Sequence, residues 1–265
     1  MTDPFVVCDI SDGIATATLN DAAKLNPIST PLQLRLREVL AQVRADKSVR
    51  AMILTGAGKG FCAGADLSSL DTGQKQSLGQ AAAESIDRLT NPIIRELREL
   101  PFPVVSAVNG PAAGAGVGLA LAADIVLAAR SAYFYLPFLP KLGIVPDAGC
   151  TWFLPRLVGP ARALGLTLLG EKLSAERAVQ WGLIWECVDD VALLGRARIL
   201  AKQLATMPAH AALEARRAFG AAERNTLPEQ LQYECDRQRE LIDGPAFAEG
   251  ARAFMEKRAP VFRER

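Results

Sequence analysis

Two glycine-rich turns are the features of this sequence best suited to chemistry. The first, 56–60, follows the apolar run 51–55, and the second, 109–111, follows the apolar run 104–108. Short apolar runs bounded by Asn, Gly or Pro are typical of strands buried on both faces of a parallel sheet. Two such turns can direct two backbone N–H groups at one oxygen atom, which would stabilise the negative charge that develops on a thioester or amide carbonyl.

The small residues of 114–123 predict a buried helix after the second turn. The first turn of a helix has backbone N–H groups without a partner in the helix, and these can bind an anion. Glycines also let another backbone come close, so tight packing between helices with no ligand explains the same pattern. Both interpretations stay open on this stretch alone.

Asp147 is the carboxylate that could move a proton at such a site. It lies between the apolar segment 144–146 and Gly149, where we expect a helix to begin. A carboxylate next to a developing enolate can act as a general base, but an aspartate at a helix start can equally cap the helix. The spacing does not separate the two roles. Asp66 and Asp124 present the same choice, and we expect both to hold turns together.

Other catalytic chemistries find no support in the residue types. His210 is the single histidine and falls in the helical part of the chain, so a Ser-His-Asp or Cys-His arrangement is not expected. No cluster of His, Asp and Glu has the spacing of metal ligands, so we expect no metal site. Neither GxGxxG with a ribose-binding acid nor GxxxxGK[ST] occurs, which disfavours dinucleotide and P-loop binding.

The elements that would position these residues indicate an α/β fold. Residues 5–19 predict a β-hairpin, 32–43 a helix, and 80–100 a helix that is kinked or split at Pro92. Strands that alternate with helices predict a sheet of βαβ units. Helical patterns dominate after residue 156: 160–169, 174–181, 190–206, 208–220, 227–242 and 245–257.

From this change of character we predict a sheet-bearing core over residues 1–190 and a helical region over residues 191–265. The polar segment 68–79 predicts a mobile loop.

Composition restricts the class of protein. The 265 residues carry a formal net charge of +1 and no long basic run, which argues against nucleic acid as a partner. The apolar stretch 112–128 is rich in small residues and contains Asp124, so we expect no membrane span. The five cysteines are scattered and no secretory signal is visible. We therefore expect reduced thiols in a cytoplasmic protein.

An ordered set of motifs resembles the enoyl-CoA hydratase/isomerase (crotonase) superfamily over nearly the whole chain. The matching segments are 19–20, 61–66, 109–116, Asp124, 143–146 and 254–258. The resemblance implies a crotonase-type spiral of ββα units, an α/β fold with a helical C-terminal trimerisation region. It also implies an acyl-CoA thioester substrate, with coenzyme A as part of the substrate and no separate cofactor, and a homotrimer or a dimer of trimers.

The resemblance also assigns roles to individual residues. The backbone N–H groups of Ala65 and Ala115 would polarise the thioester carbonyl, with Gly116 as the alternative second donor. Lys257 in the tail would approach a phosphate. The remainder of the coenzyme A would lie near the segments 24–26 and 63–65. The residues expected to bind it there are Lys24, Leu25, Asn26, Ala63 and Gly64.

Two departures from the family pattern concern the reaction type. Hydratases of this superfamily carry two glutamates at positions that correspond here to Gly118 and Leu139. Adding water to a 2-enoyl-CoA needs an acid and a base, so hydratase activity is not expected. Asp147 stands where hydratases have a small residue. One carboxylate that removes a proton and returns it elsewhere suffices to move a double bond, provided that the oxyanion hole holds the dienolate.

The segments 141–159, 168–170 and 181–185 are most similar to a branch of the superfamily that acts in bacterial phenylacetate degradation. Isomerases of that branch turn the ring epoxide of a phenylacetyl-CoA thioester into an oxepin, and they also shift double bonds in 3-enoyl-CoA esters. Cys150 departs from the glycine expected there, and we expect its thiol to belong to the core.

Three alternatives remain. A fatty-acid isomerase that converts 3-enoyl-CoA into 2-enoyl-CoA would use the same base and oxyanion hole. A dehalogenase-like acyl-CoA hydrolase would use Asp147 as a nucleophile, but it also needs a histidine on the helix 80–100, which has none. A non-catalytic protein that binds CoA esters would have no need to keep Asp147 and both turns.

Overall fold

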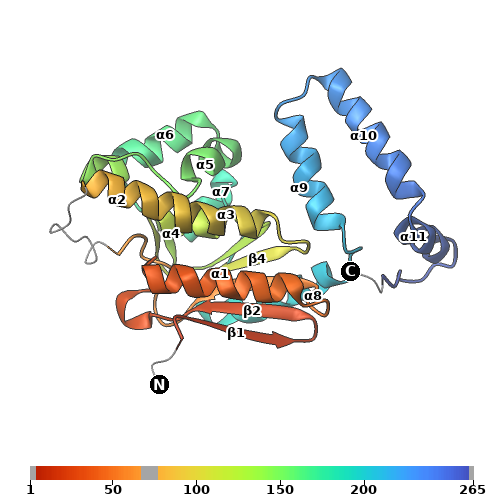
Figure 1. The fold of residues 1–265 in the computed structure, drawn as a ribbon, viewed down its shortest axis with the longest axis horizontal. Helices are drawn as coiled ribbons and strands as arrows, with labels where there is room; N and C mark the ends of the chain where they lie inside the picture. The colour runs from red at the N-terminus through yellow and green to blue at the C-terminus, as the bar shows by residue number, and fades with distance from the viewer. Residues whose placement is uncertain (1–3, 67–76, 263–265) are drawn as a thin grey trace.

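A computed structural model describes residues 4–66 and 77–262. Two β-sheets with helices packed on them form a body, and further helices extend from it (Figure 1). The larger sheet has the order β1-β2-β3-β4-β6-β9. Its strands are β1 (Val6–Ser11), β2 (Ile14–Leu19), β3 (Ala51–Gly56), β4 (Val104–Val108), β6 (Ile125–Ala129) and β9 (Glu186–Val188).

The strands of the larger sheet follow the predicted pattern. β1 and β2 pair antiparallel as the expected hairpin, and its turn residues Asp12 and Gly13 both have positive φ, as a tight hairpin turn requires. From β2 onward all neighbouring strands are parallel. Every residue of β4 is buried, which explains why its sequence is apolar throughout.

The smaller sheet consists of very short strands. They are β5 (Ala112–Ala113), β7 (Tyr133–Tyr135) and β8 (Leu173–Ser174), in the order β5-β7-β8. The sequence predicts a short strand at 132–134, which corresponds to β7, whereas β5 and β8 are too short to produce a periodic pattern.

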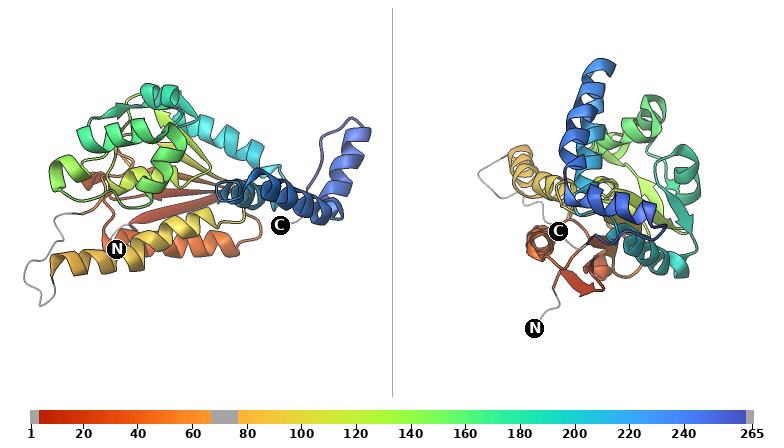
Figure 2. Two further views of the ribbon diagram at one scale, coloured as in Figure 1. Left: turned by 90° about the horizontal axis from the view of Figure 1, so that it is seen from above. Right: turned by 90° about the vertical axis from the view of Figure 1, so that its right-hand side faces the viewer.

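Helices cover both faces of the larger sheet (Figures 1 and 2). α1 (Thr30–Ala45) lies over β1 and β2 and buries the apolar stripe that its spacing predicts. α8 (Leu193–Ala205) lies on the opposite face, over β3 and β4. The other helices of the body are η1 (Ala22–Lys24), α4 (Ala115–Leu121), η4 (Phe138–Leu142), α5 (Cys150–Val158), α6 (Pro160–Leu169), α7 (Ala175–Trp181) and η5 (Asp190–Ala192).

The predicted helix 80–100 is one helical rod with an irregular middle. It consists of α2 (Leu78–Ser85), a π-helical turn η3 (Ile86–Thr90) and α3 (Asn91–Arg98). Pro92 lacks an N–H group and cannot bond the carbonyl of Arg88, which instead accepts a hydrogen bond of 3.3 Å from Arg37. The break expected at Pro92 therefore takes the form of a π turn. Most of the predicted mobile loop, 68–79, lies outside the described residues, which resume at residue 77.

The helical region predicted over residues 191–265 begins with α8, which packs on the sheet. Leu193, Ala197 and Ala201 of α8 are buried in the same core as the strands. The outer region, called the tail below, consists of α9 (Ala211–Ala222), α10 (Leu227–Ile242) and α11 (Pro245–Met255). It extends away from the body (Figure 2). No helix in the described parts of the chain is long and apolar enough to cross a membrane.

A largely buried ion pair helps to fasten the tail to the body. Asp124, expected to hold a turn, accepts a hydrogen bond of 2.8 Å from the Val104 N–H at the start of β4. It also pairs with Arg216 of α9 at 2.5 Å. The side chain of Arg216 is only 8% exposed and donates to the carbonyls of Leu100 and Phe102 as well.

Removing this buried guanidinium should loosen the tail. We expect Arg216→Ala to lower the free energy of unfolding by about 3 kcal/mol, because Asp124 loses its buried charged partner and the carbonyls of Leu100 and Phe102 lose a donor. The neighbouring Arg217 is 60% exposed and pairs with Glu214 at 3.6 Å, so Arg217→Ala should cost about 0.5 kcal/mol or less. Urea unfolding at one fixed protein concentration measures both. Equal losses would contradict the assignment.

Candidate active site

Two asparagine side chains hold the turn that follows β3. Asn26 is fully buried, and its Nδ2 donates to the carbonyls of Gly60 at 2.8 Å and Ala57 at 3.0 Å. Asn109, which follows β4, accepts from the Gly56 N–H at 3.1 Å and donates to the Gly58 carbonyl at 3.1 Å. The turns after β3 and β4 are thereby tied to each other.

Asn26 therefore corrects one expectation. Its Oδ1 accepts from the Asp21 N–H at 2.8 Å, so both ends of the amide are bonded within the protein. The side chain has a structural role in place of the expected contact with coenzyme A. Sequence reasoning also missed the role of Asn109, because an Asn-Gly-Pro sequence indicates a turn without showing what its amide binds.

The turns touch through their backbones. Gly64 has φ +87°, and a Cβ there would lie 2.7 Å from the Ala113 carbonyl oxygen. Gly114 has φ +54° and ψ −128°, a combination open essentially to glycine. A Cβ on Gly64 would also lie 3.4 Å from the Cα of Gly114. Ala65 and Ala115 are the next residues of these two contacting turns.

The backbone N–H groups of Ala65 and Ala115 make no hydrogen bond among the described residues, while their neighbours do. Ala63 donates to Leu25 at 2.9 Å and Ala113 donates to Cys62 at 2.9 Å. Ala115 opens α4, where the first N–H groups have no partner in the helix. The contact between the turns thus contains two free donors, as an oxyanion site requires.

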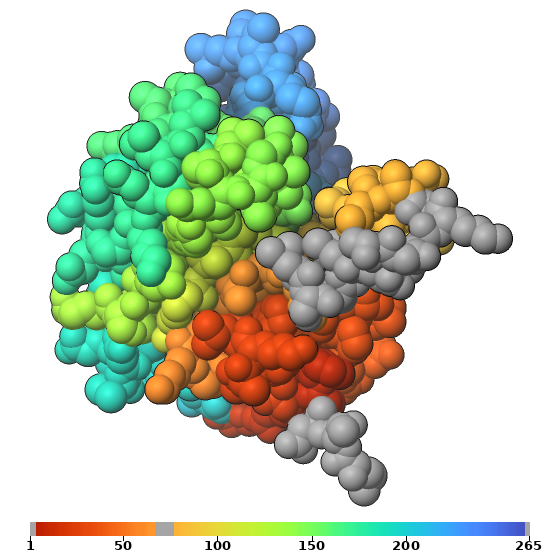
Figure 3. All heavy atoms as spheres, turned by 90° about the vertical axis from the view of Figure 1, so that its left-hand side faces the viewer, coloured from red at the N-terminus to blue at the C-terminus, as the bar shows by residue number. Residues whose placement is uncertain are grey.

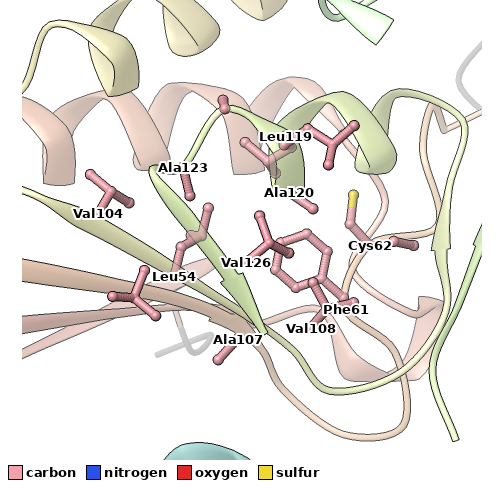
Figure 4. Close-up of a cluster of buried hydrophobic side chains, with 14 of the residues drawn as sticks. Leu54, Phe61, Cys62, Val104, Ala107, Val108, Leu119, Ala120, Ala123 and Val126 are labelled. Atoms are coloured by element: carbon pink, nitrogen blue, oxygen red, sulfur yellow. The ribbon is translucent and has the colours of Figure 1, made fainter. Parts of the chain in front are cut away.

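Gly116, the alternative donor, has a packing role. A Cβ at this position would lie 2.5 Å from the Cys62 carbonyl oxygen, so the absent side chain lets α4 lie on the segment before Gly64. Figure 4 shows Cys62 and Phe61 beneath α4, close to Leu119 and Ala120 of that helix. All four side chains are buried.

The structure brings most of the predicted coenzyme A contacts together. The segment 25–28 runs beside 63–65, joined by hydrogen bonds from Ala63 to Leu25 and from Ile28 to Gly64. Lys24, Leu25 and Ala63 are exposed. Lys257 follows α11, the last helix of the tail, whereas this group belongs to the body.

Asp147 lies between η4 and α5 and does not cap the helix. The N-cap of α5 is Gly149, with no side-chain hydrogen bond, so the capping alternative is wrong. Asp147 Oδ1 is buried and has no partner among the described residues. Burial raises the pKa of the Asp147 carboxyl above its usual range, and a hydrogen bond from its own backbone offsets part of this. The next residue, Ala148, has φ +49°, and such backbone strain is common at functional sites.

The turn that carries Asp147 packs on α4. A Cβ on Gly118 would lie 2.1 Å from the Ala148 carbonyl oxygen, and Cys150 Sγ lies 3.9 Å from the Gly114 carbonyl. Asp147, the candidate base, and Ala115, a candidate oxyanion donor, thus lie on segments in direct contact. Gly118, at the position where hydratases have their first glutamate, therefore has no room for any side chain.

The two buried thiols near the site are not nucleophiles. The pKa values of Cys62 and Cys150 are raised to about 12, mainly by burial and, for Cys150, also by the nearby charge of Asp147. Both stay protonated at neutral pH, and the thiolate is the reactive form. The expectation that Cys150 belongs to the core agrees with its complete burial.

Figure 3 shows the end of the body opposite the tail, with the N-terminal segment (red) and the segments around residues 130–170 (green) on the same face.

The sequence pattern of the enoyl-CoA hydratase/isomerase family matches residues 9–265. The chain belongs to this family. The crotonase fold and the acyl-CoA class of enzyme predicted from the motifs are thereby confirmed.

Similar proteins span almost the full length. The 1,2-epoxyphenylacetyl-CoA isomerase of Escherichia coli K12 is 47% identical over 97% of this chain and 98% of its own length. A Rhodobacter capsulatus protein named "Probable enoyl-CoA hydratase" is 42% identical over 96% of both chains. The crystal structure of an enoyl-CoA hydratase from Polaromonas sp. JS666 has a TM-score of 0.90 at 31% identity, covering 97% of this chain and 99% of that one.

The contact at Gly118 can be tested by adding one methyl group. We expect Gly118→Ala to lower the free energy of unfolding by about 2 kcal/mol and to displace the Asp147 turn, because overpacking forces the backbone apart. The control is Gly165→Ala in α6, where a Cβ meets nothing within 4 Å and should stabilise the helix by about 0.5–1 kcal/mol. Thermal unfolding measures both, and a neutral Gly118→Ala would contradict the close contact.

The buried carboxylate should cost stability when it is ionised. The pKa of Asp147 is raised in the folded state. The folded protein is therefore most stable, as far as this group is concerned, below the pKa of the unfolded chain, and it loses that stability as pH rises through the folded pKa. Asp147→Asn should therefore raise Tm at pH 7. This advantage should disappear as pH falls below about 4. A Tm difference that does not change with pH would show that burial of charge is not the cause.

Proposed function

We propose that the protein is an acyl-CoA isomerase that works through a thioester enolate, with 2-(1,2-epoxy-1,2-dihydrophenyl)acetyl-CoA as its substrate. The carrying observation is the buried Oδ1 of Asp147, which has no partner among the described residues, on a turn that packs against α4, where one of the two N–H donors without a bond in the described structure lies. The likeness to the Escherichia coli isomerase supports the choice of substrate.

The proposed reaction needs one base. The thioester oxygen accepts hydrogen bonds from the Ala65 and Ala115 N–H groups, and Asp147 removes a proton from the acyl group at the α or γ carbon. The electron pair of the broken C–H bond moves into the enolate, whose oxygen carries the charge. Collapse of the enolate relocates the double bond, with the proton returned from Asp147 to another carbon. With the ring epoxide, the C–C bond of the epoxide breaks as the ring double bonds shift, which gives the oxepin, and Asp147 returns the proton to a ring carbon.

Hydration finds less support. The positions of the two hydratase glutamates hold Gly118, packed on Ala148, and Leu139. The fatty-acid 3-enoyl-CoA isomerase remains the second candidate, because the same base and donors serve a linear acyl group.

The proposal extends to assembly as a homotrimer or a dimer of trimers through the tail. Large apolar side chains of the tail are strongly exposed in the single chain, with Phe219 at 74%, Phe254 at 83% and Met255 at 81%. Apolar side chains gathered in this way are typical of subunit interfaces. A neighbouring tail would also explain how Lys257 could approach bound coenzyme A.

Turnover in D2O tests the reaction. Wild-type protein should isomerise 3-enoyl-CoA to 2-enoyl-CoA, incorporate deuterium and convert the ring epoxide, without hydrating 2-enoyl-CoA. Asp147→Asn should bind CoA esters yet lose about 10³-fold in rate, because no other group replaces the base. Mass spectrometry follows each product. Rapid hydration, or near-normal turnover by the variant, would overturn the proposal.

A further inference from the structure

The helix that begins beside the proposed base is weak by itself. α5 starts at Cys150, and its N-cap, Gly149, makes no side-chain hydrogen bond. Pro155 lies inside the helix and has no N–H group to donate to the carbonyl of Thr151, one turn earlier. A helix of nine residues with these two defects gains little stability from its own hydrogen bonds. Contacts with other elements must therefore hold it in place.

Arg156 of α5 makes contacts of this kind. Its Nε pairs with Oε2 of Glu223, the C-cap of α9, at 2.8 Å. Its Nη1 donates to the Trp152 carbonyl at 3.0 Å, and its guanidinium stacks on the Trp152 ring, 4.2 Å from the ring centre. One side chain thus joins the first turn of α5 to the end of a tail helix.

The contacts of Arg156 cross an opening between the body and the tail. A cleft of about 920 Å³ lies there. Trp152 and Phe153 at the start of α5 line one side of it, and Phe219 and Glu223 at the end of α9 line the other. Arg156 contacts Trp152 on the first side and Glu223 on the second. The arginine is therefore a bridge between the two helices.

A series of contacts leads from the stacked ring to the proposed base. The rings of Trp152 and Phe153 meet edge to face, with their centres 5.0 Å apart. The Phe153 ring lies against Gly149, where a Cβ would be 2.8 Å from it. The N–H groups of both aromatic residues donate to the Gly149 carbonyl at 2.9 Å, and the Cys150 N–H donates to the Asp147 carbonyl at 2.9 Å. The first turn of α5 and the Asp147 turn are thus held together.

We propose that Arg156 is a positioning residue for the isomerisation, which holds the start of α5, and with it the carboxylate of Asp147, in the place where that carboxylate removes the proton. The arginine acts through Trp152 and Glu223 and not on the substrate itself. α4 holds the Asp147 turn at Gly118, and the bridge holds it through α5. The inference rests on the proposed function in that it takes Asp147 as the base.

A comparison of Tm values at pH 7 tests the link between Arg156 and Asp147 without any measurement of activity. Asp147→Asn should raise Tm in the wild-type protein, as argued above. In the Arg156→Gln background the rise should be smaller by about 2 °C. The reason is that a loosened turn lets water reach the carboxylate, so that its burial costs less. An arginine that only stabilised the tail would leave the effect of Asp147→Asn unchanged, and such additivity would overturn the inference.

Arg162→Gln in α6 is the matched control. Arg162 also stacks on a tryptophan, Trp181, with its guanidinium 5.3 Å from the ring centre, and donates to the Trp181 carbonyl at 3.4 Å. It makes the same kinds of contact, but with α7. Its loss should leave the effect of Asp147→Asn on Tm unchanged.

Isomerisation of a 3-enoyl-CoA measures the catalytic consequence. Arg156→Gln should lower kcat about tenfold, with KM changed less than about twofold, because a misplaced base slows the chemical step and leaves binding intact. Glu223→Gln removes the partner in the tail and should act in the same direction. A kcat equal to that of the wild-type protein in both variants would overturn the inference.

Arg156→Lys decides the matter if Arg156→Gln does not fold. Lysine keeps the charge and lacks the planar guanidinium that stacks and pairs at once, so it should lower kcat and reduce the effect of Asp147→Asn in the same way. No change in either quantity would overturn the inference. A protein that shows the effect on Tm but no isomerisation would refute the proposed function and leave the link between Arg156 and the Asp147 turn standing.

Discussion

Contact between backbones, with no side chain between them, is the constraint on which the site depends. At Gly64, Gly110, Gly116 and Gly118 a Cβ would lie within 2.1–2.7 Å of a carbonyl oxygen of another segment. These contacts set the turn after β3, the start of α4 and the Asp147 turn against one another. Main-chain groups held in this way are aligned before a substrate arrives, and such preorganisation is the main source of electrostatic catalysis.

The site also contains groups that the fold must hold at a cost. The buried Oδ1 of Asp147 lacks a partner in the described part of the chain, and Ala148 has a left-handed backbone. Neither feature stabilises the folded chain. The buried strands β3 and β4 and the apolar stripe of α1 offset these costs. The free energy gained by burying these apolar side chains therefore compensates for the unfavourable groups at the candidate site.

Sequence reasoning succeeded where a pattern repeats along one element. The apolar runs of β3 and β4 and the helical spacing of α1, α6 and α10 predict those elements well. It failed where contacts between segments far apart in the sequence determine the structure. The apolar spacing of α8 resembles that of the tail helices, so the sequence does not show that α8 packs on the sheet. The spacing around Asp147 left base and cap open, and only the placement of its side chain excludes the cap.

The contact of Asp124 with both Val104 and Arg216 joins two parts of the molecule through one carboxylate. β4 begins at Val104 and ends immediately before the turn that leads to the oxyanion donors. Docking of the tail and order of that strand are consequently one cooperative unit, and free energy gained by either is shared with the other. Any contact that stabilises the docked tail therefore also stabilises β4 and the turn that follows it.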